Sequence, residues 1–301
     1  MASLRTIQTI TCTPGKVCFR IKGAANDVAL LFCIIGCKFG QESNMEISGA
    51  VAFVTGGSGG LGSRICSRLA DDGVAVAIGY NQGQERAEEV KTQVTANGGV
   101  AITVQVDQMV PASIDAAVSR VVGELGSLDI LVNNAAIASG GHSIDPGDLD
   151  AFTPEIWDEM MAVNVRGPYL VARSAAGHLR ASKWGRIVNI GSTLGHGDWY
   201  QDRIFAPSKA AVIPLTRFLA ASLAPDVTVN CVAPGLMVET ALGGGGPKPG
   251  ENNKAYDAWR DRSALKGFTD IDDVASQVVS FCKARSITGQ SVGIDAGVHF
   301  H

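Results

Sequence analysis

Two side chains near the middle of the chain, Ser192 and Lys209, have polar groups that could act on a carbonyl or alcohol oxygen. Ser192 follows a β-branched run, and Phe205 and Lys209 come later in one apolar segment. Lys209 lies four residues after Phe205, one helical turn away on the same face. A serine hydroxyl at the carboxyl end of a strand can donate a hydrogen bond to a substrate oxygen and stabilise charge that develops on it. These residues are therefore the candidate reaction centre.

A glycine-rich turn follows the first β-branched run of the main part of the chain. Residues 55–62 have the sequence Thr-Gly-Gly-Ser-Gly-Gly-Leu-Gly, and a helical pattern begins there. Such a turn lets the backbone approach a pyrophosphate, whose charge the amino end of the helix favours. The turn predicts a dinucleotide site. Its expected contacts are Gly56, Ser58, Gly60, Leu61 and Gly62.

The turn after the second strand carries no acidic residue that would select NAD. It contains Tyr80 and Asn81, and no arginine stands within it. Without a carboxylate to repel a 2′-phosphate, NADP is favoured, with NAD as the alternative. Asp107, after the third strand, is a candidate for the adenine end, although an aspartate there is also an ordinary turn residue.

The same glycines also fit the nucleophile elbow of serine hydrolases, with Ser58 at its centre. That alternative needs a later acid and then a histidine, and His299 and His301 at the end of the chain are poor candidates. A second local trio, Ser192, His196 and Asp198, is more typical of a loop than of a catalytic relay. The dinucleotide site is the stronger prediction.

Composition bounds the class of protein. The 301 residues carry a net charge of −4 and scattered basic residues, so we expect no nucleic-acid partner. Seven cysteines, an odd number, favour a reduced, cytoplasmic setting. The apolar run Val28–Cys37 is shorter than the roughly 20 residues a membrane span needs. Cys33 and Cys37 lack a second pair of ligands, so no metal site is expected.

The segments predict an α/β fold with one large domain. Residues 1–44 differ in character and are expected to form an extension outside the catalytic fold, whereas residues 45–301 alternate strand and helix patterns. We expect a Rossmann-like, doubly wound, seven-stranded parallel sheet with helices on both faces. The expected strands are Val51–Thr55, Val74–Gly79, Val100–Val106, Leu128–Asn133, Arg186–Gly191, Val227–Val232 and Ser291–Ile294.

These motifs, in this order, resemble the short-chain dehydrogenase/reductase family over roughly residues 46–298. The family pattern of Ser, about thirteen residues, then Tyr-x-x-x-Lys is matched by Ser192 and Lys209, with Phe205 at the tyrosine position. The resemblance implies that Asn164 holds a water linked to Lys209, and that Lys209 binds the nicotinamide ribose. It further implies cofactor contacts in three later segments. These contacts are Asn134 and Ala135, Pro234 and Gly235, and Thr240, which comes one residue later than the family pattern.

The missing phenol leaves three hypotheses open. The protein is an NADP-dependent reductase or dehydrogenase in which the tyrosine has been replaced and activity impaired, a variant of the fold that performs a non-redox reaction, or a noncatalytic cofactor-binding protein. General acid–base help is worth about 10² to 10⁴-fold in rate, which is the expected scale of impairment. Tyr200 is the nearest other phenol in sequence.

The expected partners are a small hydrophobic carbonyl or alcohol and further copies of the chain. The predicted pocket walls are apolar and aromatic: Ala138–Asp150, Leu194–Arg203 with Trp199, and Leu236–Lys266. A homodimer or homotetramer is expected through two long helices, Thr153–Ala181 and Arg203–Leu223. Their alanine-rich stretches, Ala172–Ala176 and Ala220–Ala221, would permit close approach of helices.

Overall fold

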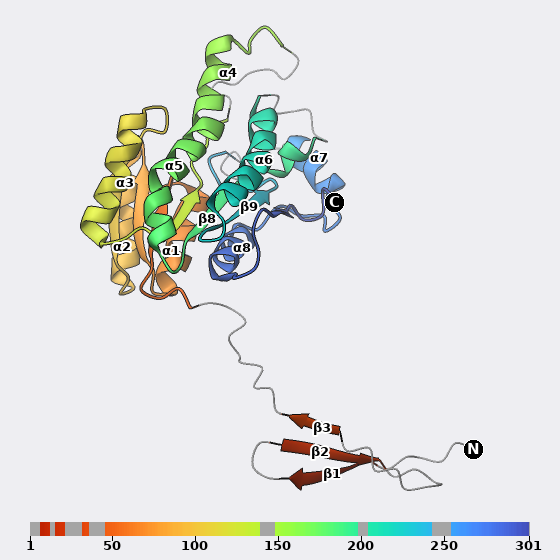
Figure 1. Ribbon diagram of the computed structural model, residues 1–301. Coiled ribbons are helices and arrows are strands. Elements are labelled where there is room, and N and C mark those ends of the chain that lie inside the picture. The colour runs from red at the N-terminus through yellow and green to blue at the C-terminus, as the bar shows by residue number, and fades with distance from the viewer. Residues whose placement is uncertain are drawn as a thin grey trace. The chain divides into compact units, whose positions relative to one another are not determined.

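The structure is a computed structural model that describes residues 7–12, 16–21, 32–35, 46–138, 148–197, 204–242 and 254–300 (Figure 1). The chain divides into two compact units, residues 1–45 and 46–301. In the first unit, β1 (Ile7–Cys12), β2 (Lys16–Ile21) and β3 (Phe32–Ile35) form an antiparallel sheet in that order. The separate role of residues 1–44 stays a prediction. None of the helices in the described ranges combines the length and the apolar character that crossing a membrane requires.

The second unit is built on seven parallel strands, as the sequence predicts. Their order across the sheet is β10-β9-β8-β7-β4-β5-β6. The chain runs outward from β4 to β6 on one side and from β7 to β10 on the other, so the topology reverses between β4 and β7. Ligands of such sheets bind outside the carboxyl ends of the strands at this point. The strands are β4 (Val51–Val54), β5 (Ala75–Tyr80), β6 (Ala101–Gln105), β7 (Ile130–Asn133), β8 (Arg186–Ile190), β9 (Thr228–Pro234) and β10 (Ser291–Ile294).

Helices cover both faces of this sheet because successive strand side chains alternate between two apolar cores. Ala52 and Val54 of β4 contribute to one core, with α1 (Gly60–Asp71), α2 (Gln84–Ala96) and α8 (Ile271–Lys283). Val51 and Phe53 contribute to the other, with α3 (Pro111–Leu125), α5 (Gly167–Ala181) and α6 (Phe205–Leu223). Parallel strands buried on both sides have this near-continuous apolar pattern. The predicted fold class is therefore confirmed.

The predicted helix Thr153–Ala181 exists, but it has three parts. Thr153 caps α4 (Pro154–Met161) by accepting a hydrogen bond from the Ile156 amide at 3.4 Å. A π-helical turn, η2 (Ala162–Arg166), follows and leads into α5. Such turns concentrate at functional sites, and this one contains Asn164. Two short helices complete the unit: η3 (Thr193–His196) and α7 (Lys254–Arg262).

Most of the alanines in the two alanine-rich stretches face the sheet. Ala172 and Ala175 of α5 and Ala220 of α6 are buried in the core against the sheet. These alanines lie on the side of each helix that faces the sheet, because a helix that packs closely on a sheet needs small side chains there. Large exposed apolar side chains on the same helical segments are instead Trp157, Tyr169 and Phe218. Ala176 is half-buried and Ala221 is exposed, and the homo-oligomer through these helices stays a prediction.

Candidate active site

A cavity of about 560 Å³ lies at the carboxyl ends of the strands, across the point where the topology reverses. This volume is within the range of small-molecule and cofactor sites. Every predicted cofactor contact lines it, as do Ser192, Phe205 and Lys209, whereas Asn164 does not. The predicted cofactor contacts in the lining are Gly56, Ser58, Gly60, Leu61, Gly62, Tyr80, Asn81, Asp107, Asn134, Ala135, Lys209, Pro234, Gly235 and Thr240. The chain thus gathers residues from six strand ends in one place.

The glycine turn has a shape that side chains would destroy. Gly56 has a φ of +62°, and a Cβ there would stand 2.9 Å from the Cα of Ala135. A Cβ on Gly62 would overlap the carbonyl oxygen of Gly56. The amino end of α1 has no side-chain cap and no acidic residue in its first turn. The backbone amides there face the cavity, and the glycines have no side chains that would fill the space beside them. This arrangement fits a pyrophosphate.

Asn134 and Thr55 hold this turn against the next strand. The Asn134 side-chain amide donates to the carbonyl oxygens of Thr55 and Gly56, each at 3.0 Å. In return, the Thr55 hydroxyl accepts from the backbone amides of Asn134 and Ala135, each at 3.1 Å. Two strands that meet at the switch point are therefore tied together directly under the candidate cofactor, and Asn134 has a positioning role.

Arg86 is a candidate cofactor contact that the sequence argument missed. It belongs to the first turn of α2 rather than to the strand-end turn, yet it lines the same cavity as Tyr80 and Asn81. Its guanidinium folds over Gly83, where a Cβ would stand 2.5 Å from Nη2. Asp107 also lines the cavity, while its carboxylate accepts from the Met109 amide at 2.8 Å as a turn residue does.

Ser192, Phe205 and Lys209 meet at the other end of the cavity. The Ser192 hydroxyl accepts from the Leu194 amide at 3.2 Å and donates to the Pro234 carbonyl at 3.4 Å. Lys209 is 3% exposed, and its Nζ donates to the Ile190 carbonyl at 2.8 Å. That Nζ lies 5.6 Å from the centre of the Phe205 ring. The Phe205 ring packs in a small apolar cluster with Met160 and Ile204.

Burial changes the acidity of the lysine. Removal from water penalises the ammonium and lowers the pKa of Lys209 from 10.5 to about 8. The Cys231 thiol on β9 is the group whose charge would oppose this. However, burial raises the pKa of Cys231, so the thiol stays neutral near pH 7. Lys209 is thus a buried cation without an adjacent anion to compensate it.

Asn164 acts behind the cavity wall. Its Oδ1 accepts from the Ile137 amide at 2.9 Å, and its Nδ2 donates to the Ile137 carbonyl at 2.8 Å and the Ser208 hydroxyl at 3.0 Å. Ser208 in turn donates to the Phe205 carbonyl at 2.7 Å. The side chain therefore links the strand-end loop after β7 to the first turn of α6 and fixes the backbone that carries Phe205.

Apolar side chains from the segments after β8 and β9 and from α7 form part of the cavity wall. The wall includes Leu194, Leu236, Met237, Leu242 and Trp259. A Cβ on Gly235 would stand 2.8 Å from the Trp259 ring, so α7 packs directly on the turn after β9. Thr240 lines the cavity near the amino end of α1, where its methyl would lie 3.4 Å from a Cβ on Gly60. The segment after β9 thus covers the glycine turn.

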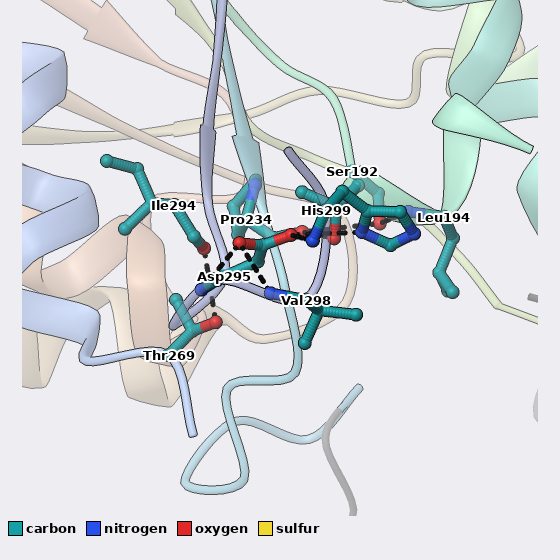
Figure 2. A network of polar contacts seen from close by, with 10 residues as sticks. Ser192, Leu194, Pro234, Thr269, Ile294, Asp295, Val298 and His299 are labelled. Atoms are coloured by element: carbon teal, nitrogen blue, oxygen red, sulfur yellow. Dashed lines mark hydrogen bonds and ion pairs between the residues drawn. The ribbon is translucent and has the colours of Figure 1, made fainter. Parts of the chain in front are cut away.

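The serine hydrolase alternative finds no support in this cavity. No histidine is among the described residues that line it. His299 instead binds Asp295, with 3.0 Å between Nδ1 and Oδ2, and its ring centre lies 6.5 Å from that of His196. The Asp295 carboxylate also accepts from the backbone amides of Gly297, Val298 and His299, which closes a tight turn (Figure 2). In the described ranges there is no group of three His, Cys, Asp or Glu residues placed to hold a metal.

Several predicted residues lie outside the described part of the chain. These are Asp198, Trp199, Tyr200 and His301, together with most of the predicted wall between residues 138 and 150. Arg203, the expected start of α6, is also outside it, and the described helix begins at Phe205.

Comparisons with known proteins agree with this geometry. The short chain dehydrogenase family profile matches residues 50–245. The 3-oxoacyl-(acyl-carrier-protein) reductase FabG of Staphylococcus aureus strain Mu50 is 30% identical over 251 residues, which cover 82% of this chain and 97% of the reductase.

Two solved structures are similar over the same region. A short chain dehydrogenase from Burkholderia cenocepacia J2315 in complex with NADP is 39% identical, with a TM-score of 0.75, over 84% of this chain and 99% of that one. A blue fluorescent protein from a metagenomic library in complex with NADPH is 31% identical, with a TM-score of 0.74, over 85% and 100% of the two chains.

The family match covers the glycine turn, the strand ends and the segment with Ser192 and Lys209, which are the features that form the cavity. The predicted oxidoreductase family is confirmed. This chain belongs to the short chain dehydrogenase family.

Proposed function

We propose that the protein is an NADPH-dependent reductase of hydrophobic ketones, or the reverse alcohol dehydrogenase, with turnover lowered by Phe205. The observation that carries this proposal is the meeting of Ser192, Phe205 and Lys209 at one end of a cavity whose other end suits a dinucleotide. The reverse reaction uses the same residues, so the cavity alone does not set the direction.

The residues present fit a nicotinamide dinucleotide. The glycine turn and the amino end of α1 would hold the pyrophosphate, and Asn81 and Arg86 would hold the adenosine ribose with its 2′-phosphate. Pro234, Gly235 and Thr240 would line the nicotinamide, and Lys209 would bind its ribose. When bound, the reduced cofactor supplies two electrons as a hydride. The Burkholderia relative, which is similar over 84% of this chain, was solved in complex with NADP.

Ser192 would act on the substrate oxygen. A hydrogen bond from the Ser192 hydroxyl to that oxygen stabilises the negative charge that grows as the carbonyl is reduced. The ring of Phe205 has no proton to deliver, so the phenol of the family pattern is absent at the place where the oxygen would lie. Losing a general acid lowers turnover by about 10² to 10⁴-fold. The apolar side chains in the cavity lining favour a ketone on a hydrophobic skeleton.

The deciding experiment restores the missing oxygen. Phe205→Tyr should raise NADPH-dependent turnover of a panel of hydrophobic ketones by about 10² to 10⁴-fold with little change in NADPH affinity. Phe152→Tyr is the matched control, because Phe152 packs against the same apolar cluster and gains the same hydroxyl away from Lys209. No NADPH-dependent turnover of any ketone in the Phe205→Tyr variant, with cofactor binding verified, would refute the reductase.

A second function is a stable NADPH-binding protein without turnover. Two observations favour it. Phe205 lacks the hydroxyl group of a tyrosine, and the chain is similar to a blue fluorescent protein solved in complex with NADPH. In this case bound NADPH would keep its fluorescence during hours with any ketone, in both the Phe205 chain and Phe205→Tyr. A non-redox reaction at the bound cofactor would instead be detected as product formed without NADPH consumption. Cytoplasmic localisation and homo-oligomer formation remain predictions.

A further inference from the structure

The cavity contains one described group near Phe205 that can lose a proton near neutral pH. Lys209 and Ser192 line the cavity beside the ring. A serine hydroxyl does not ionise in this range, so by itself it can only share its proton with a substrate oxygen. The other described side chains of the lining that can ionise are Tyr80, Arg86 and Asp107, which follow β5 or β6 at the opposite end, and Glu159, which is exposed on α4.

The contacts of Lys209 aim its ammonium at the reaction centre. The side chain is 3% exposed, and one of its three N–H bonds is used by the Ile190 carbonyl at 2.8 Å. Ile190 ends β8, two residues before Ser192, so this bond fixes Nζ beside the serine strand end. The Nζ atom lies 5.6 Å from the centre of the Phe205 ring, which lacks the hydroxyl group that a tyrosine would carry. Two N–H bonds remain to serve a ligand.

The electrostatic setting lets this lysine exchange its proton. The elements packed against α6 are η3, β9, η2, α4, α5 and β8. Their titratable or charged groups are His196; Cys231; Arg166; Glu155, Asp158 and Glu159; Tyr169, Arg173, His178 and Arg180; and Arg186. Among them, a charged Cys231 thiolate would raise the pKa of Lys209. Burial raises the pKa of Cys231, however, so this thiol is neutral near pH 7 and has no such effect. Burial therefore dominates and lowers the pKa of Lys209 to about 8.

We propose that Lys209 is the proton donor and acceptor for the substrate oxygen in this chain, in place of the phenol that is missing at position 205. The inference rests on the proposed reductase. In reduction, the carbonyl carbon gains a hydride from a reduced nicotinamide, and the π electrons of the C=O bond move to oxygen. The oxygen takes one proton from the Lys209 ammonium, which becomes a neutral amine and regains a proton from water. No bond forms between lysine and substrate.

The pH dependence of the unaltered chain is the first test. Reduction needs the ammonium, so kcat should fall as pH rises above about 8, while oxidation of the product alcohol needs the amine and should rise through the same pH. NMR of lysine-labelled, cofactor-free protein should show one lysine that titrates near this pH and that is absent from Lys209→Met. The NMR signal does not depend on turnover.

Chemical rescue separates proton transfer from a structural role. Lys209→Ala should lose at least about 10²-fold in kcat, and added small primary amines should restore turnover in the order of their pKa values. Lys91→Ala, an exposed change on α2, should alter neither rate nor rescue. NADPH fluorescence measures cofactor binding in each variant, so a loss of binding is seen directly.

The outcomes distinguish the two proposals. Mirror-image pH profiles together with amine rescue support Lys209 as the donor. The lysine role is overturned, and the reductase stands, if Phe205→Tyr is active while the unaltered chain shows no turnover. The same holds if kcat of the unaltered chain does not change as pH passes about 8. If Phe205→Tyr is also inactive with NADPH bound, both are overturned.

Discussion

Replacing the buried lysine with an apolar side chain of similar length should make the cofactor-free protein more stable. Lys209→Met removes a cation that has no adjacent anion. Lowering its pKa from 10.5 to about 8 corresponds, at about 1.36 kcal/mol per pKa unit, to a cost of roughly 3 kcal/mol at pH 7. Loss of the hydrogen bond to the Ile190 carbonyl offsets about 1 kcal/mol of the gain. We expect a net increase of about 2 kcal/mol in the free energy of unfolding.

The pH dependence has a definite sign. Below about pH 8 the lysine is charged in both the folded and the unfolded chain, and the whole penalty is present. Between about 8 and 10.5 the unfolded chain holds more protons than the folded chain, so the stability of the unaltered protein rises with pH. The advantage of Lys209→Met should therefore shrink across this window. Above it, the variant should be less stable by about 1 kcal/mol, the worth of the lost hydrogen bond.

Urea unfolding of both proteins without cofactor, at pH 7 and at pH 10, measures this difference. Lys91→Met is the control, because Lys91 is exposed on α2 and only pairs with Glu88. Its effect should stay within about 0.5 kcal/mol at both values of pH. A Lys209→Met protein that is less stable at pH 7, or whose advantage does not change with pH, would show that the buried ammonium is compensated, and the reasoning would fail.

Three further changes test the cofactor end and the framework. Arg86→Ala should weaken NADPH binding by about 10- to 100-fold and leave NADH binding unchanged in fluorescence titrations, because one charged hydrogen bond to a phosphate is lost. Gly62→Ala should abolish NADPH binding, since its Cβ would overlap the Gly56 carbonyl, whereas Gly123→Ala, in an open position of α3, should retain it and gain about 0.5 to 1 kcal/mol of stability. Asn164→Ala should cost about 2 to 4 kcal/mol in urea unfolding through its three lost hydrogen bonds.

The architecture was predictable because two independent patterns in the sequence agree. The β-branched runs are apolar on both sides, as in β4, where all four residues are buried. The segments between them have helical periodicity and bury one stripe. A parallel sheet with helices on both faces satisfies both patterns, and the connections then bring the strand ends to one edge. The glycine turn was recognisable for the same reason, since its glycines follow the first strand directly.

Features that depend on tertiary contacts were not predictable from local patterns. Arg86 reaches the cavity because its guanidinium can lie over Gly83, a contact between side chain and backbone that periodicity does not encode. The burial of the α5 alanines against the sheet was also not predictable, since the direction of a helix stripe is set by the sheet that it covers. The π-helical turn at Asn164 was not predicted, because an asparagine inside a helical pattern marks a locally unfavourable position but not the type of helical turn.

The way in which residue 205 is held bears on what its replacement can mean. The backbone at this position is fixed from behind by the chain of hydrogen bonds from Asn164 to Ser208 to the Phe205 carbonyl, and none of these bonds involves the ring. Lys209 and Ser192 are likewise fixed by backbone carbonyls, of Ile190 and Pro234. Substitution between phenylalanine and tyrosine therefore leaves every other described contact of the centre in place. Comparing the two proteins consequently isolates one oxygen atom, and any difference in turnover measures what a phenol adds to a site that already has a buried lysine.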